Sequence, residues 1–294
     1  MTRVTRPPVP PSQAAGVLAV LVCHNGEQWL RLALSALRRS TGTPRHILAV
    51  DTGSTDGTAR ILAQAAGAEK LLDGVLTLPT ETGFGSAVTA AVEHAVQRWG
   101  DPGSWVWLLH DDCAPEPACL DTLLATAEVA HSVGIVGPLL VDWNDPRLIT
   151  GAGLSMDVAG NRHSGGVPEL SETVKGSAEE TVVLRRTTEE LAVSSAGMLI
   201  RRSLWQRLSG FDPGLPLFFD DIDLGWRANQ SGSVVLCVPD ARMRHVAAAS
   251  TRQRDTPALP CAPHRARRAY GLRTYLVNCS GPAFLLGMPR LVLL

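Results

Sequence analysis

The segment Trp105-Val-Trp-Leu-Leu-His110-Asp111-Asp112-Cys-Ala-Pro115 decides how the rest of this chain of 294 residues is interpreted. A short apolar run ends abruptly in a histidine and two aspartates, and a proline follows. Such a run is typical of a strand buried inside a parallel sheet. Acidic residues at its carboxyl end would lie where open α/β folds bind their ligands. The alternative is a solvated turn after a strand, and the rest of the sequence has to distinguish the two.

Strands and helices are predicted to alternate up to this segment. The strands are short apolar runs, and the helices carry apolar residues at helical spacing. The predicted strands lie at residues 17–23, 46–50, 71–78 and 105–109, and the helices between them at 29–37, 61–66 and 87–96. This alternation indicates βαβ units on a parallel sheet, and therefore the α/β fold class.

The second half of the chain is less regular. The expected helices lie at 120–131, at 203–208 and around Trp226, and the expected strands at 134–138, 192–201 and 233–238, the last ending near His245. Residues 157–190 are polar and short of large apolar side chains, which predicts a mobile loop or a hairpin. Residues 1–13 are rich in proline and arginine and are expected to form a disordered tail.

Composition limits the classes of protein. Hydrophobic residues make up 45% and charged residues 19%, as in globular proteins. The formal net charge of -1 gives no support to nucleic-acid binding. The six cysteines form no Cys-x-x-Cys pair, which argues against a zinc site or a disulfide framework and favours a reducing compartment. The run at 17–23 continues into polar residues and resembles a strand more than a signal peptide.

Acidic residues recur after successive predicted strands. Asp51, the triplet 110–112 and the cluster Asp220, Asp221 and Asp223 follow this pattern, with His245 beyond them. Strand ends on one parallel sheet can converge on one edge, where carboxylates suit a divalent cation that holds a phosphorylated substrate. His110 and Asp112 are two residues apart on an extended segment, so both could face one metal ion.

Each motif also has a simpler interpretation. The turn at 51–58 can merely cap the next helix, and it lacks the Gly-Lys-Ser/Thr ending of a P-loop. The glycine-rich turn at 82–85 can be a plain tight turn. Asp221 can be an N-cap instead of a general base. His245 can be a structural histidine.

Taken together and in this order, the motifs resemble the inverting family-2 glycosyltransferases, especially their bacterial rhamnosyltransferase-like and galactofuranosyltransferase-like branch. The matching segments are 20–25, 50–58, 82–85, 108–112 with Pro115, 195–201, 210–212, 219–227 and His245. The resemblance implies a GT-A fold, in which helices flank a Rossmann-like, mixed, mostly parallel sheet in a single catalytic domain.

The resemblance also implies roles for individual residues. Asp221 would be the catalytic base. The nucleotide-sugar donor would be bound by Asp51, Thr82, Gly83 and Asp111; the metal ion by Asp112, His110 and His245; and Asp220, Asp223, Trp226 and Arg227 would support the site. His110 stands where the family has the first aspartate of its Asp-x-Asp motif, and Thr82 where many members have asparagine.

The expected activity is metal-dependent, inverting transfer of a sugar from a UDP- or dTDP-sugar to a cell-envelope polysaccharide or a lipid-linked glycan. The cation, Mn²⁺ or Mg²⁺, would offset charge on the leaving diphosphate. One alternative is a catalytically degenerate nucleotide-sugar-binding domain of a larger membrane assembly. Another is a nucleotidyltransferase or hydrolase on a similar sheet.

The expected domain boundaries place the catalytic domain at 14–255, with a nucleotide-sugar half at 14–115 and an acceptor half at 116–255. Residues 256–294 combine basic and apolar side chains, which suits contact with an anionic membrane surface. The alternative for this segment is a helix packed on the catalytic domain. No run reaches the roughly 18 apolar residues of a spanning helix. The expected location is the cytoplasm, at the cytoplasmic face of the cell membrane, with no nucleic-acid partner.

Overall fold

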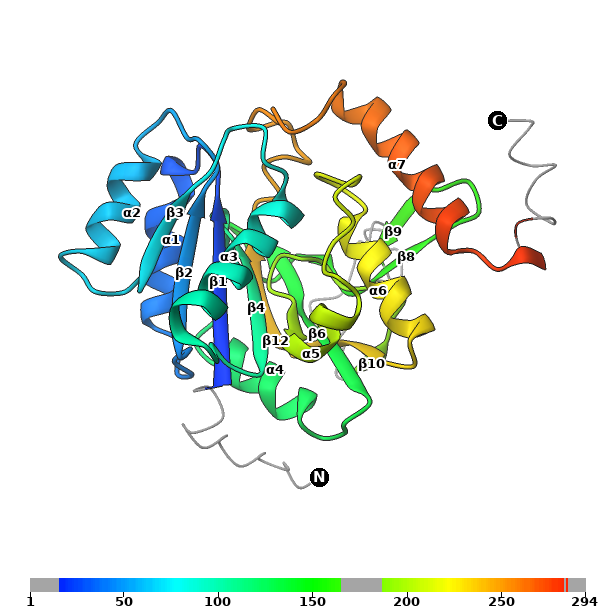
Figure 1. The fold of residues 1–294 in the computed structure, drawn as a ribbon, viewed down its shortest axis with the longest axis horizontal. Helices are drawn as coiled ribbons and strands as arrows, with labels where there is room; N and C mark the ends of the chain where they lie inside the picture. The colour runs from blue at the N-terminus through cyan, green and yellow to red at the C-terminus, as the bar shows by residue number, and fades with distance from the viewer. Residues whose placement is uncertain (1–15, 165–186, 283, 285–294) are drawn as a thin grey trace, which may run out of the picture.

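A mixed sheet with helices on both faces forms the centre of the protein (Figure 1). The computed structural model describes residues 16–164, 187–282 and 284. The strands are β1 Val17–Cys23, β2 His46–Asp51, β3 Gly74–Thr77, β4 Trp105–His110, β5 Cys113–Pro115, β6 Val133–Asp142, β7 Ile149–Gly151, β8 Leu154–Met156, β9 Arg162–Ser164, β10 Thr188–Glu189, β11 Leu199–Arg201 and β12 Val234–His245. The helices are α1 Glu27–Arg38, α2 Thr58–Ala66, α3 Phe84–Trp99, α4 Cys119–Ala127, α5 Arg202–Arg207, α6 Asp220–Gln230 and α7 Pro263–Asn278.

The main sheet has the strand order β10-β12-β6-β11-β4-β1-β2-β3, with β5 added to β12 and β7 to β6. Strand β1 is buried along its whole length and pairs in parallel with both β2 and β4. Its register aligns Cys23 with Asp51 and Val22 with His110, so the carboxyl ends of these strands meet at one edge. The predicted α/β fold with a mixed, mostly parallel sheet is confirmed.

The second half of the sheet brings distant segments to the same edge. Strand β11 is antiparallel to β4 and β6, while β12 is parallel to β6. The short strand β5 is antiparallel to β12 and aligns Cys113 with His245. This pairing carries the end of β12 next to the residues that follow β4.

Several predicted elements have different bounds in the structure. The strand predicted at 192–201 is shorter, because the chain turns at Gly197 with a φ of +94° before β11 begins at Leu199. The helix predicted at 120–131 ends at Ala127. The strand predicted at 233–238 continues to His245, with a register shift between Val238 and Arg242.

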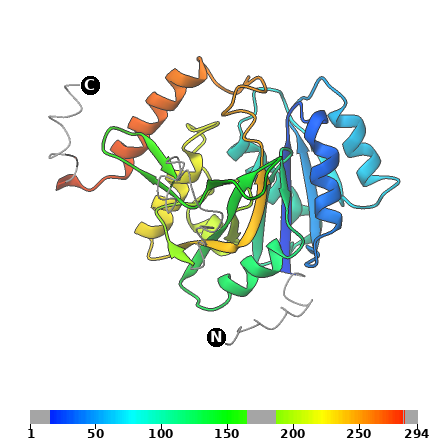
Figure 2. The same cartoon turned by 180° about the vertical axis from the view of Figure 1, so that it is seen from behind.

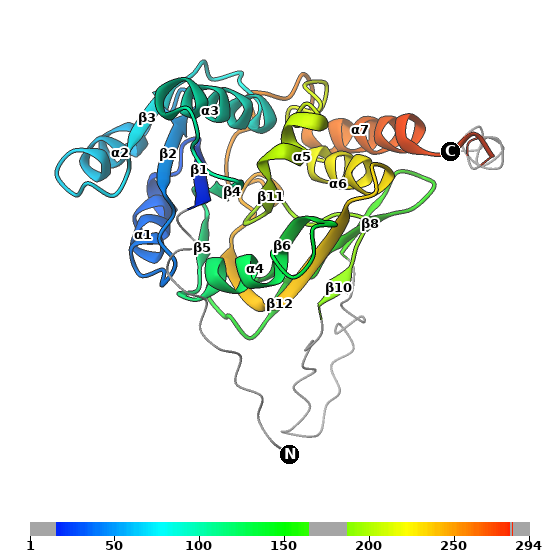
Figure 3. The same cartoon turned by 60° about the horizontal axis from the view of Figure 1, so that its bottom comes forward.

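Two apolar layers hold the helices against the sheet. Side chains of α1, α2 and α4 pack with Trp107 and Leu109 on one face. Side chains of α3, α5 and α6 pack with Val106 and Leu108 on the other. Figure 3 shows α3 and α6 on the opposite side of the sheet from α4. Burial on both faces explains why β4 reads as a continuous apolar run.

Part of the C-terminal segment forms a helix that packs on the rest of the protein, which was the alternative to contact with a membrane surface. Helix α7 has a proline in its first turn and packs on α6. Asn278 at its end donates to Asp223 at 2.9 Å, and its carbonyl accepts from Gln230 at 2.7 Å. None of the helices in the described part of the chain combines the length and apolar character needed to cross a membrane.

The described part of the segment predicted as a loop or hairpin, 157–164 and 187–190, contains strands β9 and β10. Strands β8 and β9 form a separate antiparallel hairpin, and β10 joins the main sheet beside β12. Figure 2 shows this hairpin on the same side of the molecule as α6 and α7. Residues 165–186, like the predicted tail at 1–13, lie outside the described residues.

Leu108→Ala is expected to lower the free energy of unfolding by about 2–5 kcal/mol, because it opens a cavity between the sheet and α3. Leu108 is completely buried, whereas Leu32 on α1 is 56% exposed. Leu32→Ala is therefore the matched control and should change stability by less than about 0.5 kcal/mol. Urea unfolding measures both variants, and equal losses would contradict the described core.

Candidate active site

A pocket of about 160 Å³ opens at the carboxyl edge of the sheet. Its walls come from the ends of β1 and β4, the start of α3, the loop that leads into α6, and the segment after β12. The predicted residues that line it are Thr82, His110, Asp111, Asp112, Asp220, Asp221 and His245. The structure therefore brings together residues that are far apart in the sequence.

His110, Asp112 and His245 form a compact group of metal-binding side chains. One ligand atom from each lies within 4.8 Å of the others. Asp112 Oδ1 is 3.5 Å from His245 Nε2 and 3.9 Å from His110 Nδ1. The other oxygen, Asp112 Oδ2, accepts a hydrogen bond from the backbone N–H of Ala248 at 2.8 Å. The pairing of β5 with β12 creates this geometry.

The electrostatics of the group favour metal binding. Burial, reinforced by the charge of His245, lowers the pKa of His110 to about 3. His110 is therefore a neutral imidazole, the form that binds metals. Burial alone would raise the pKa of Asp112, but His245 and His110 together hold that pKa well below its usual range. Asp112 is consequently ionised and can act as a carboxylate ligand.

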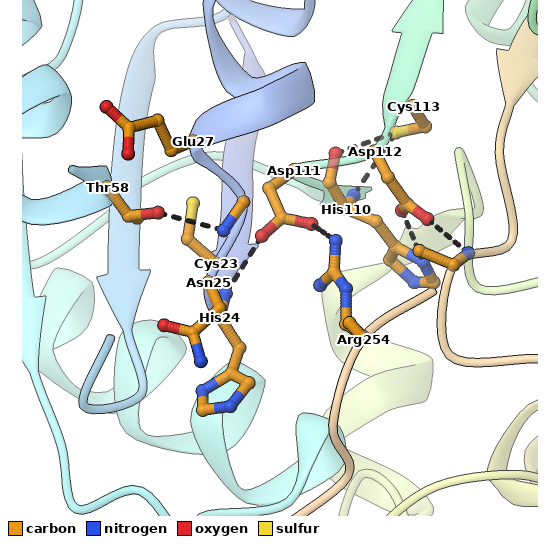
Figure 4. Close-up of polar contacts among 12 residues, drawn as sticks. Cys23, His24, Asn25, Glu27, Thr58, His110, Asp111, Asp112, Cys113 and Arg254 are labelled. Carbon is orange, nitrogen blue, oxygen red and sulfur yellow. Dashed lines mark hydrogen bonds and ion pairs between the residues drawn. The ribbon is translucent and has the colours of Figure 1, made fainter. Parts of the chain in front are cut away.

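Asp111 points the other way and joins three segments of the chain (Figure 4). It is fully buried; Oδ2 accepts from the backbone N–H of His24 at 2.8 Å, and Oδ1 accepts from Arg254 at 2.6 Å. Burial raises its pKa to about 6, against the opposing effect of Arg254. A Cβ atom at Gly26 would lie 2.2 Å from Oδ2, so glycine is needed there. Both oxygens are engaged, and donor contact by Asp111 stays a prediction.

The other predicted donor-binding residues differ in their access to the pocket. Asp51 is 3% exposed, caps the backbone N–H of Ser54 at 3.1 Å and is not among the residues that line the pocket. Thr82 does line it. Gly83 packs against Pro216, where a Cβ atom would lie 2.6 Å from the proline backbone. Gly83 thus serves the close packing of α3 on this loop.

Asp221 lies in the first turn of α6 and faces Arg162 across the pocket wall. The guanidinium of Arg162 contacts both carboxylate oxygens, at 3.1 Å and 3.0 Å. Asp221 is 2% exposed, and its oxygen also accepts from the backbone N–H of Ile222. Beside it, burial and then the charge of Asp221 raise the pKa of Asp220 to about 8. Asp220 therefore favours its protonated form near neutral pH.

The remaining predicted residues lie outside the pocket and hold α6 in place. Arg227 forms an ion pair with Asp223 at 2.6 Å and donates to the carbonyls of Leu208 and Gly210. Trp226 packs edge-on against Tyr275 of α7, with ring centres 6.2 Å apart. These contacts fix the orientation of the helix that carries Asp221.

Sequence reasoning assigned no role to several polar residues of the pocket, among them Arg162, Ser195 and Arg254. Ser195 Oγ lies 3.1 Å from His110 Nε2 and orients that ring. The only signal for Arg254 was the general richness in arginine near the end of the chain. Arg162 fell within the segment predicted as a loop or hairpin, and no local pattern indicates its partner Asp221.

Comparison with known proteins identifies relatives of the chain. A family model described as "Glycosyltransferase like family 2" matches residues 14–259. An N-acetylglucosaminyl-diphospho-decaprenol L-rhamnosyltransferase of Mycobacterium tuberculosis is 28% identical over 253 residues, covering 83% of this chain and 80% of that protein. The galactofuranosyltransferase GlfT1 of the same species is 31% identical over 132 residues, but the match covers only 41% of its length.

Solved structures with the same fold include two glycosyltransferases. GalNAc-T7, crystallised with UDP, GalNAc and Mn²⁺, has a TM-score of 0.59 at 18% identity; the match covers 78% of this chain and 43% of that one. The mannosyltransferase PcManGT from Pyrobaculum calidifontis, in complex with GDP-Man and Mn²⁺, has a TM-score of 0.55 at 17% identity. The match covers 96% of this chain and 81% of that one. The expected GT-A fold is confirmed.

Asp220→Asn is expected to change how stability depends on pH. Because burial raises the pKa of Asp220 to about 8, the folded protein keeps a proton that the unfolded chain loses near pH 4. The wild type therefore loses stability as the pH rises from about 4 to 8, and the amide variant escapes this loss. The difference in Tm between Asp220→Asn and the wild type should therefore grow in favour of the variant from pH 5 to pH 8.5. Each kcal/mol of stability that the wild type loses over this range corresponds to about 2–4 °C in Tm.

Thermal unfolding at both pH values measures this difference. Asp240→Asn changes an exposed aspartate and is the matched control. Its difference in Tm from the wild type should not change with pH. The same flat profile for Asp220→Asn would show that the buried carboxyl does not retain its proton.

Proposed function

The chain belongs to glycosyltransferase-like family 2, and from this membership we propose that it is a metal-dependent, inverting enzyme that transfers a sugar from a nucleotide diphosphate sugar to a lipid-linked glycan of the cell envelope. One observation carries the proposal. The metal-binding group His110, Asp112 and His245 and the carboxylate of Asp221 line the same pocket. Such a site can neutralise a leaving diphosphate and accept a proton within one substrate-sized space.

The donor atoms of the metal-binding group indicate the class of cation. Two imidazole nitrogens and one carboxylate oxygen suit a transition-metal ion better than Mg²⁺, which prefers oxygen ligands. We therefore favour Mn²⁺ over Mg²⁺. Such an ion would act as a Lewis acid toward the leaving nucleoside diphosphate. His110, which stands in place of the first carboxylate of the family motif, would supply a nitrogen ligand to such an ion.

Asp221 would accept the proton of the acceptor hydroxyl as that oxygen attacks the anomeric carbon and the nucleoside diphosphate leaves from the opposite side. Arg162 already contacts both oxygens of Asp221. Each carboxylate oxygen has two lone pairs, so Arg162 leaves room for a hydroxyl donor. Arg162 would thereby position Asp221.

The donor and acceptor sides of the pocket are assigned by their neighbours. We place the nucleotide beside β1, β2 and Thr82 in the half at 14–115, and a UDP- or dTDP-sugar as the donor. The acceptor would approach from α6 and the half at 116–255. The name of the mycobacterial rhamnosyltransferase specifies a sugar carried on a lipid diphosphate, which supports a lipid-linked acceptor here.

Contact with the cytoplasmic face of a membrane would suit such an acceptor. Helix α7 carries the exposed apolar side chains Leu276 and Val277 near its end, and Phe284 follows. Basic residues occupy its first half, at His264, Arg265 and Arg267. A surface with both features can lie on anionic lipid.

A degenerate nucleotide-sugar-binding domain is the second candidate, because Arg162 pairs with the proposed base and His110 departs from the family motif. Turnover separates the two functions. A thermal-shift panel of UDP-, dTDP- and GDP-sugars with and without Mn²⁺ should first identify the donor, since a ligand that binds only the folded state raises its stability. Release of nucleoside diphosphate then supports the enzyme, and saturation without release supports the binding domain.

Asp112→Ala and His110→Ala are expected to weaken Mn²⁺ binding. The loss should be at least the roughly 10–100-fold that removal of a supporting partner of a metal ligand costs. Isothermal titration with Mn²⁺ alone measures it, and circular dichroism checks folding. His131 is exposed and lies outside the pocket, so His131→Ala is the matched control. Unchanged affinity in both variants would place the cation elsewhere.

Asp221→Asn is expected to lower kcat by about 10²–10⁴-fold, because the amide cannot accept the acceptor proton. The side chain keeps its size, and Mn²⁺ and nucleotide affinities should stay near those of the wild type. The exposed Asp240 supplies the control variant Asp240→Asn. Steady-state release of nucleoside diphosphate measures both, and near-normal turnover of Asp221→Asn would refute the assigned base.

A further inference from the structure

A second cavity, of about 570 Å³, adjoins the candidate active site. Its walls come from the turn of the β8–β9 hairpin, the residues before α6, and the first half of α7. Arg162, Phe218 and Ser250 line both spaces, so the two cavities share a wall. In Figure 1 the elements around this cavity lie on the far side of the molecule from β2 and β3.

The cavity is strongly basic. Its charged or ionisable lining residues are Arg162, His264, Arg267 and Arg268, and no acidic side chain lines it among the residues that the structure describes. Arg162 is already paired with Asp221 at the wall shared with the first pocket, as Arg254 is with Asp111. The cavity lining nevertheless combines three guanidinium groups and one imidazole.

Arg267 is held in place without a carboxylate from the described residues. Its guanidinium stacks on the ring of Phe218 at 4.4 Å and donates to the carbonyl of Ser250 at 3.1 Å. Burial, and then the nearby charges of Arg162 and Arg252, lower the pKa of Arg267. A fixed, half-buried guanidinium with N–H groups to spare is suited to a phosphate.

We propose that this basic cavity binds the phosphate or diphosphate group that carries the acceptor sugar. The inference rests on the proposed function and adds the chemical class of group that the acceptor must contain. The metal-binding group lies among the residues of the first pocket and would serve the donor diphosphate, whereas the basic cavity lies on the side of Asp221. Two anionic groups, one per substrate, would thus have separate cationic partners.

The position of the cavity is compatible with an acceptor sugar that is linked to a lipid. Arg162 contacts Asp221 and also lines the cavity, so a sugar that follows the bound phosphate would reach the proposed base. Helix α7 supplies Arg267 and Arg268 to the cavity and carries the exposed Leu276 and Val277 farther along. A lipid chain that leaves the cavity along α7 would meet this apolar end.

Arg267→Glu tests the proposal with farnesyl diphosphate as the probe, titrated without divalent cations so that the metal-binding group does not attract it. Replacing an attractive charge by a repulsive one should weaken binding by about tenfold or more. Arg207 is exposed at the end of α5 and lies outside both cavities, so Arg207→Glu is the control of equal charge change. Arg267→Gln, which avoids charge reversal, should give a smaller loss, and thermal unfolding verifies that each variant folds.

Three further measurements separate the proposal from its rivals. Farnesol should bind much more weakly than farnesyl diphosphate, and equal affinity would overturn the role of the phosphate. UDP and dTDP with Mn²⁺ should bind Arg267→Glu as they bind the wild type, and a parallel loss would assign the cavity to the donor. Binding to phosphatidylglycerol vesicles that falls in Arg267→Glu, while farnesyl diphosphate binding does not, would assign the charges to a membrane headgroup.

The two proposals fail in different ways. A wild-type protein that binds sugar nucleotides and releases nucleoside diphosphate, but does not bind farnesyl diphosphate, would refute the basic-cavity proposal alone. A wild-type protein that binds farnesyl diphosphate through Arg267, but neither binds nor turns over any sugar nucleotide, would refute the proposed transfer reaction and with it the assignment of the anion to an acceptor.

Discussion

The buried carboxylate of Asp111 is the constraint on which the site depends. A charge with no access to water must be paired, because an uncompensated buried charge costs several kcal/mol. Here the partners are the N–H group of His24 and the guanidinium of Arg254, which come from opposite ends of the chain. Arg254 in turn lies over the ring of Trp29 on α1.

This ion pair fixes the segment after β12. Because Arg254 must reach Asp111, the residues between His245 and Arg254 have to cross the carboxyl edge of the sheet and form one wall of the pocket. The N–H group of Ala248 in that segment holds Asp112 by its second oxygen. The two neighbouring aspartates therefore have different roles. Asp111 holds the segment after β12 in place, and Asp112 faces the pocket together with His110 and His245.

The parts of this arrangement that follow from local pattern were predictable from the sequence. The apolar run of β4, the alternation of strands and helices, and the meeting of strand ends all follow from residues close in sequence. The triplet that begins at His110 and the distant His245 were linked through family resemblance. The pairing of β5 with β12, which places them side by side, involves three residues of β5 and leaves no periodic signal.

The contacts that were not predictable join segments far apart in the chain. Arg162 and Asp221 are 59 residues apart, and Arg254 and Asp111 are 143 apart. Neither arginine carries a motif, because a guanidinium can pair with a carboxylate from almost any backbone position. Asp51 shows the converse: its motif was recognised, yet its side chain caps the local turn and stays out of the pocket lining.

The pairing of Arg162 with Asp221 has a consequence for how the proposed enzyme would use its donor. Water is always present at a site open to solvent, and an unrestrained carboxylate next to an activated sugar would promote wasteful hydrolysis. A carboxylate whose two oxygens both contact a guanidinium has fewer lone pairs free to accept a proton from a stray water molecule. A phosphate that arrives in the adjoining cavity would compete for the N–H groups of Arg162 and free Asp221 to accept a hydrogen bond when the correct hydroxyl arrives. The sugar would then be transferred to the glycan acceptor and not to water.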